Sequence, residues 1–228
     1  TDILIGNARF SLKIGMAQLM SGGQSESMAT FNAALKTSDQ LLSQTPQFKK
    51  VSGIIESFVT ASVAPGQLRA IIKKGDNDVV NQGEAAHKQC MSEMSSLFQQ
   101  SNEFKIAFAR EAMSGFEKFG KDALAAAEFM LVASHDGTKV AIHSVYDDAY
   151  CEKIATKMKL QARFKTSSRK IKKAKTGEYN FWSVISLIVN AMDESFYENG
   201  NILTEANILM KMLKGVKSFL SKTWKRVT

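Results

Sequence analysis

Cysteine and proline are scarce in this sequence. Its 228 residues include two cysteines, Cys90 and Cys151, and two prolines. Two thiols so far apart do not build a disulfide framework, and neither has a second thiol nearby that would indicate a zinc site. We therefore expect a reducing, intracellular location and no metal. The shortage of proline favours long, uninterrupted helices.

Long hydrophobic runs are missing as well. A membrane-spanning helix needs about 20 apolar residues, and the best candidates, 123–133 and 181–192, are shorter. We therefore expect no stable membrane insertion. Residues 1–6 lack the basic and apolar regions of a signal peptide. The first residue is Thr rather than Met, which favours a processed product, such as a piece of a polyprotein.

Catalytic motifs are also missing. The glycines occur singly or as Gly22-Gly23, without the flanking residues of a phosphate-binding loop or a nucleophile elbow. His143 and Cys151 could imitate a base and a nucleophile, but such a coincidence is usually structural. The pairs Asp147-Asp148 and Asp193-Glu194 are more typical of helix ends or loops than of a catalytic dyad. The sequence thus predicts neither enzyme activity nor a cofactor.

Apolar residues that recur three and four positions apart predict helices over much of the chain. The expected helices span residues 8–20, 27–42, 46–63, 67–74, 79–119 (as one helix or two end to end), 122–133, 181–192 and 204–220. Short strands are expected at 139–145, 157–164 and 179–182. The sequence therefore predicts a helix-dominated α+β fold, in which a long helical N-terminal region, 1–135, precedes a small α/β head, 136–228.

One broad face of segment 79–119 is apolar and rich in phenylalanine. Its members include Leu97, Phe98, Phe104, Phe108, Ala112, Met113, Phe116 and Phe119. Such a face either packs inside the protein or docks on a partner protein. The pattern by itself favours the protein's own core.

Positive charge is concentrated in the second half of the chain. Residues 1–120 carry 12 basic and 11 acidic side chains, and residues 121–228 carry 18 and 11, so the net charges are +1 and +7. Clustered Lys and Arg are typical of proteins that bind polyanions, because each contact with a phosphate releases condensed counterions.

The basic segment, 157–175, carries nine of these positive charges and no acidic residue. They are Lys157, Lys159, Arg163, Lys165, Arg169, Lys170, Lys172, Lys173 and Lys175. Basic or polar residues alternate with apolar ones over 157–164, which places the former on one face of a strand. We expect sequence-independent binding to the backbone of RNA here. A solvated loop or a localisation signal is the alternative.

Several short pieces, in the same order along residues 75–228, resemble one viral protein family. The pieces are Gly75-Asp76, Val79-Val80, Glu103-Phe104-Lys105, Ala107, Ala112-Met113, Asp136-Gly137, 157–164, Tyr179-Asn180-Phe181-Trp182, Asp193, Leu203-Thr204-Glu205-Ala206-Asn207 and Thr223-Trp224. Together they resemble non-structural protein eight of coronaviruses and other nidoviruses, in a diverged, torovirus-like form. Members of that family are accessory subunits of the viral RNA-dependent RNA polymerase.

The resemblance implies a helical shaft leading into an α/β head and a non-enzymatic role in the replication complex of the host cytoplasm. It also implies binding to the polymerase, to RNA and to a small helical subunit similar to non-structural protein seven. The phenylalanine-rich face would then contact that subunit. Residues 1–60 match nothing in the family, and the segment equivalent to the shaft is nearly neutral, so we expect RNA at the basic segment instead.

Two other functions fit the same composition. A helical viral nucleoprotein would also be basic and would coat RNA. A membrane-active protein could use 204–220 as an amphipathic anchor. A processivity subunit of a viral polymerase remains the function that the sequence favours.

Overall fold

The computed structural model describes residues 2–5, 7–57, 60–63, 78–134, 139–165, 179–190 and 201–202. Its helices are α1 (Gln24–Lys36), α2 (Pro46–Glu56), α4 (Asp78–Gln100), α5 (Asn102–Ser114), α6 (Phe116–Phe119) and α7 (Asp148–Lys157), with a 3-10 helix η1 (Gln40–Gln44). Its strands are β1 (Ile3–Ile5), β2 (Ala8–Ile14), β3 (Met16–Gly22), β4 (Thr60–Val63), β5 (Phe129–Ala133), β6 (Val140–Ser144), β7 (Lys159–Lys165), β8 (Tyr179–Asn190) and β9 (Asn201–Ile202). The helices predicted at 67–74 and 204–220 lie outside the described residues.

The described strands form two sheets. The first sheet has the order β1-β2-β5-β6-β9, with β2 and β5 parallel and the other neighbours antiparallel. In the second sheet, β8 is the central strand: β3 and β4 pair along one edge and β7 pairs along the other. The predicted α+β class with predominant helix is confirmed for the described residues.

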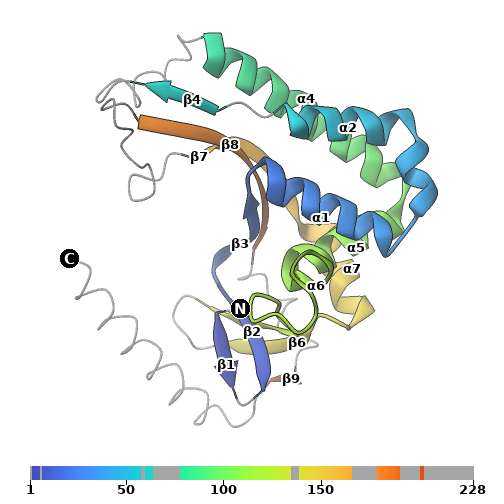
Figure 1. The fold of residues 1–228 in the computed structure, drawn as a ribbon. Coiled ribbons are helices and arrows are strands. Elements are labelled where there is room, and N and C mark those ends of the chain that lie inside the picture. Colours follow the sequence, from blue (N-terminus) through green and yellow to red (C-terminus); the bar gives the residue numbers. More distant parts are fainter. Residues whose placement is uncertain are drawn as a thin grey trace.

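The helices pack together beside the second sheet (Figure 1). Phe31 of α1 is fully buried; its ring stacks on Phe48 of α2 at 4.5 Å and meets Phe104 of α5 edge-on at 5.2 Å. Thr45 caps α2 by accepting a hydrogen bond from the Phe48 N–H, next to a proline in the first turn. Ser101 caps α5 in the same way and separates it from α4. The predicted helical segment 79–119 is therefore a series of consecutive helices.

The prediction of a helix over 8–20 is wrong. This segment forms β2 and β3, which meet at Gly15, where φ is +60°. Phe10, Leu12 and Ile14 alternate with polar residues, which is the two-residue period of a strand. The partners of these strands, β5 and β8, lie more than a hundred residues further along the chain, so local periodicity could not reveal the pairing.

The helix predicted at 46–63 ends at Glu56 as α2, and residues 60–63 form β4 instead. Two other predicted helices overlap strands. Segment 122–133 ends in β5, and segment 181–192 is replaced almost entirely by β8. Both are short apolar runs, in which periodicity does not separate a buried strand from a buried helix. The strands predicted at 139–145 and 157–164 are confirmed as β6 and β7.

The predicted boundary between 135 and 136 falls inside a hairpin. It separates β5 from β6, which pair, and beside it the Ser134 N–H donates to the Lys139 carbonyl at 2.9 Å. Strands β3 and β4 also pair with β8 across that boundary. The described part of the chain is therefore not divided into a helical region and a separate head. Among the described residues, no helix is both long enough and apolar enough to cross a membrane.

Candidate nucleic-acid interface

Strand β7 brings the start of the basic segment to the edge of the second sheet. Lys159 and Gln161 are exposed, whereas Leu160 and Ala162, which alternate with them, are half-buried. Leu160 packs against the main hydrophobic core. The predicted alternation is therefore confirmed over 159–162. Lys157 is half-buried at the end of α7.

The register of the second sheet places Gln18, Lys159 and Gln161 on one face of the sheet. Lys159 pairs with Ile188 of β8, which pairs in turn with Gln18 of β3. Gln161 lies opposite Ser186 in the next row. Residues opposite each other occupy the same face of a sheet. We call the face that carries Gln18, Lys159 and Gln161 the outer face, and all three side chains are exposed.

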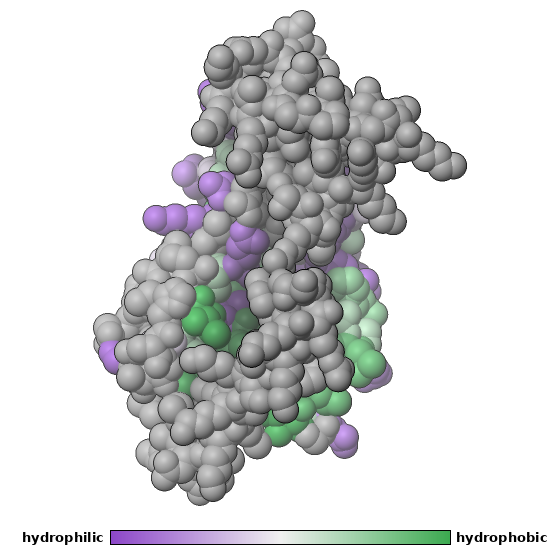
Figure 2. Space-filling model, turned by 90° about the vertical axis from the view of Figure 1, so that its left-hand side faces the viewer, coloured by the Kyte–Doolittle hydropathy of each residue, from purple (hydrophilic) through white to green (hydrophobic). Residues whose placement is uncertain are grey.

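The other face of this sheet is turned towards the helices. Ala17 and Met20 of β3 are buried in the main hydrophobic core, which also contains residues of α1, α4 and α5. Figure 1 shows these helices gathered on one side of β3 and β8. Figure 2 looks from the left of Figure 1 and shows hydrophilic residues above the centre of the view and hydrophobic ones below it. On the outer face Gln18, Lys159 and Gln161 are polar and exposed, whereas Ala17, Met20 and Leu160 on the other face are apolar and belong to the core or pack against it.

The remaining basic residues are placed only in part. Arg163 and Lys165 lie opposite Val184 and Trp182 in the register and share the alternation of Lys159, so they occupy positions on the outer face. The structure thus assigns three basic positions to one face of β7. The other predicted RNA-binding residues, Arg169, Lys170, Lys172, Lys173 and Lys175, lie outside the described residues.

Most of the predicted partner-binding face lies inside the protein. Leu97, Phe104, Phe108, Ala112, Met113 and Phe116 are at most 8% exposed and belong to the main hydrophobic core, and Phe98 is partly buried against it. Phe119 alone among the eight is largely exposed, at 48%. These six residues therefore belong to the protein's own core, because α1 and α2 cover the face that a partner would have to contact.

Cys151 and His143 do not form a nucleophile and base. The Cys151 thiol donates to the Val145 carbonyl at 3.3 Å, and burial raises its pKa. His143 instead stacks on Tyr150, with ring centroids 4.0 Å apart. Burial also raises the pKa of Cys90, to about 12. Because the thiolate is the reactive form, the raised pKa lowers the reactivity of both cysteines at neutral pH.

Asp147 and Asp148 serve the end of a helix, as predicted. Asp147 caps α7 by accepting a hydrogen bond from the Tyr150 N–H at 3.3 Å, and Asp148 forms an ion pair with Arg110. The pair Asp193-Glu194 lies outside the described residues. Among the described residues, no cluster of His, Cys, Asp and Glu has the composition of a metal site.

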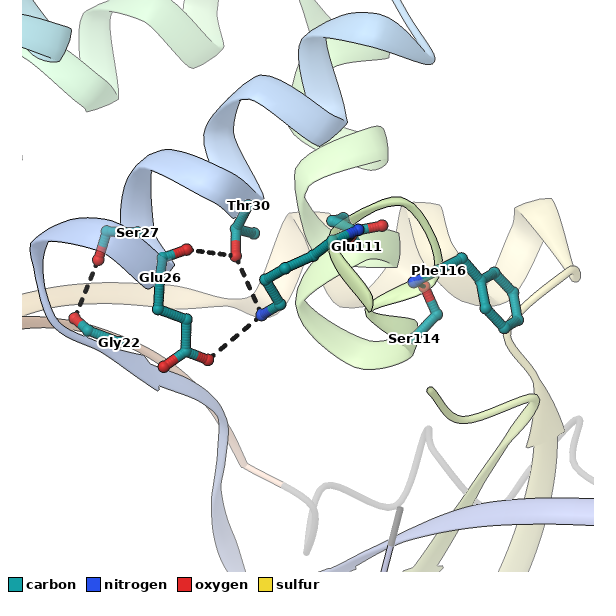
Figure 3. A network of polar contacts seen from close by, with 8 residues as sticks. Gly22, Glu26, Ser27, Thr30, Glu111, Ser114 and Phe116 are labelled. Atoms are coloured by element: carbon teal, nitrogen blue, oxygen red, sulfur yellow. Dashed lines mark hydrogen bonds and ion pairs between the residues drawn. The ribbon is translucent and has the colours of Figure 1, made fainter. Parts of the chain in front are cut away.

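A polar cluster, partly buried and missed by sequence reasoning, links α1 to α5 and α6 (Figure 3). The carboxylate of Glu111 accepts the backbone N–H groups of Glu117 and Lys118, at 3.1 and 2.9 Å. The Lys118 amine lies 3.2 Å from both Glu26 and Thr30 of α1. Burial raises the pKa of Glu111, and the two N–H donors oppose that rise. These contacts join three helices, so the role of the cluster is structural.

No family model, curated protein or solved structure shows significant similarity to this chain. Function is therefore inferred from its own residues.

Proposed function

We propose that this protein binds the sugar–phosphate backbone of RNA along β7 and the basic segment, as a non-enzymatic accessory subunit of a viral RNA polymerase. The observation that carries the RNA part is the outer face of the second sheet. There Lys159 is exposed, and Arg163 and Lys165 occupy positions of the same alternation on the same strand.

The chemistry of these residues suits a phosphate backbone. Lys is a flexible point charge that contacts phosphate well and reads base edges poorly. Lys159 is not a member of any ion pair formed among the described residues, so no carboxylate neutralises it within that part of the chain. Binding of this kind is sequence-independent and weakens steeply as salt is added.

The role as a polymerase subunit is supported by the sequence resemblance alone. Its test is co-purification of the full chain with the cognate polymerase, in the presence and absence of RNA. A discrete complex supports the accessory role. Cooperative, polymeric coating of RNA without a polymerase complex would instead select the nucleoprotein alternative.

The RNA part is tested by two charge-matched triple variants. One replaces Lys159, Arg163 and Lys165 by Ala, and the control replaces Lys49, Lys88 and Lys121, which are exposed residues outside the basic segment. If all three outer-face residues contact phosphate, the first variant should bind RNA about 100-fold more weakly at 0.1 M salt. The control should stay close to the wild type. Equal losses of RNA affinity in both variants would mean that binding depends only on the net charge of the protein. That result would contradict a site on β7.

A further inference from the structure

A groove of about 490 Å³ lies where α4 and α5 meet the start of β7. One wall comes from a single face of α4, because Met91, Ser95 and Phe98 are four and three residues apart. Met158 and Lys159 line the groove at the junction of α7 and β7. Lys105 lines it from the first turn of α5. The groove thus joins the helices to the strand that carries the basic segment.

The groove combines apolar surface with positive charge. Met91, Phe98 and Met158 are each half-buried, and the Phe98 ring is held by Phe104 and Phe108, with centroids 5.9 and 5.6 Å away. The described residues that line the groove include two lysines and no acidic residue. A ligand that matches this chemistry has a flat or bulky apolar group next to a negative charge.

We propose that the groove takes an unpaired nucleobase of single-stranded RNA, with neighbouring phosphates on Lys105 and Lys159. The inference rests on the proposed RNA binding and specifies the form of RNA that is bound. Unpaired bases can leave the strand to pack on aromatic and apolar side chains, whereas the bases of a duplex are already stacked. A strand of RNA that follows β7 would reach the groove through Lys159.

An acidic peptide with one large apolar side chain would match the same apolar surface and the same charges. Methionines are common on surfaces that bind many different partners. The position of Lys159 favours RNA, because this residue lies both in the groove and in the row of basic positions along β7. The groove therefore adjoins the basic row at Lys159, the first residue of β7, and a polyanion that passes this edge of the sheet can reach both.

The test compares two single strands that carry the same number of phosphates. One is a short RNA with all its bases, and the other is an oligonucleotide of the same length with abasic positions. Affinity for each is measured with the full chain, with Ser95→Leu and with Ser92→Leu. Both serines are exposed on α4, but only Ser95 lines the groove. Leucine is a good helix former, so we expect both variants to fold.

We expect the wild type to bind the strand with bases at least about five-fold more tightly than the abasic strand. Ser95→Leu, which fills the groove, should lose this preference, and Ser92→Leu should keep it. Equal binding of both strands by the wild type, or an unchanged preference in Ser95→Leu, would overturn the inference while leaving backbone binding intact. Absence of binding to either strand would refute the proposed function as well.

A competing outcome is measured with an acidic peptide that carries Phe between pairs of Asp. If Ser95→Leu abolishes binding of this peptide but leaves the preference for bases unchanged, the groove is a protein-docking site and the nucleobase inference is wrong. If the peptide binds all three proteins equally or not at all, while Ser95→Leu loses the preference for bases, the inference stands.

Discussion

The helical core and the exposed residues on the outer face of the second sheet differ in burial and polarity. In the core, Phe31 and Phe104 are fully buried and their rings meet edge-on at 5.2 Å. On the outer face, Lys159 and Gln161 are exposed in a regular alternation. Large buried rings stabilise a fold, whereas exposed like charges contribute little to stability. Conformational stability should therefore come mainly from the first region, and the second can change without unfolding the protein.

Replacing Phe104 by Ala should have the largest effect on stability. This side chain is fully buried among other aromatic rings, so its loss should lower the free energy of unfolding by about 3–5 kcal/mol. Phe119→Ala is the matched control, because Phe119 is 48% exposed. Chemical denaturation followed by circular dichroism measures both. Similar small losses in the two variants would show that Phe104 is not a core residue.

Replacing Glu111 by Ala should have an intermediate effect. The partly buried backbone N–H groups of Glu117 and Lys118 would lose their acceptor, which should cost about 1–3 kcal/mol. Glu152→Ala, at an exposed position of α7, is the control and should change the free energy of unfolding by less than about 0.5 kcal/mol. If Glu111→Ala lowers the free energy of unfolding no more than the control does, water must replace the carboxylate as the hydrogen-bond acceptor.

The ionisation of Glu111 should make a smaller, pH-dependent contribution. Burial raises its pKa in the folded state, so the folded protein favours the protonated carboxyl. The contribution to stability is full below the pKa of the unfolded chain, about 4.3, and is lost as pH rises through the folded pKa. Between pH 4 and 7 the free energy of unfolding of the wild type should therefore fall relative to that of Glu111→Gln. A difference that is independent of pH would contradict the raised pKa.

Replacing Lys159 by Ala should have the smallest effect on stability. Its side chain is exposed and lies at the edge of the second sheet, so the free energy of unfolding should change by less than about 0.5 kcal/mol. The same denaturation experiment serves as the measurement. A larger loss would mean that the outer face contributes to the fold and would remove the contrast between the two regions.

The fold could be predicted from the sequence where local signals were sufficient. The apolar spacing and the Thr45 cap specify α2, and the alternation after Met158 specifies β7. Strands β2, β3, β5 and most of β8 lie in segments predicted to be helices. The structure pairs β2 with β5 and β3 with β8, more than a hundred residues apart in the chain. Short apolar runs are ambiguous without knowledge of those partners.

The positive charge of the candidate site could be predicted from the sequence, but the groove beside it could not. The run of basic residues from Lys157 is visible in the sequence. The groove beside Lys159 was not, because it needs α4, α5 and β7 to come together in space. Glu111 was missed for the same reason: in the sequence it is one acidic residue among many, and only burial against α6 reveals its role.

The central claim is that β7 holds RNA by contacts to phosphate. The most direct measurement is the dependence of RNA affinity on salt for the wild type and for the triple Ala variant at Lys159, Arg163 and Lys165. Each lost phosphate contact should flatten the slope of log affinity against log salt by about 0.7–0.9. The account predicts a flattening of about 2–3 when all three residues contact phosphate. An unchanged slope and an unchanged affinity in the variant would contradict it.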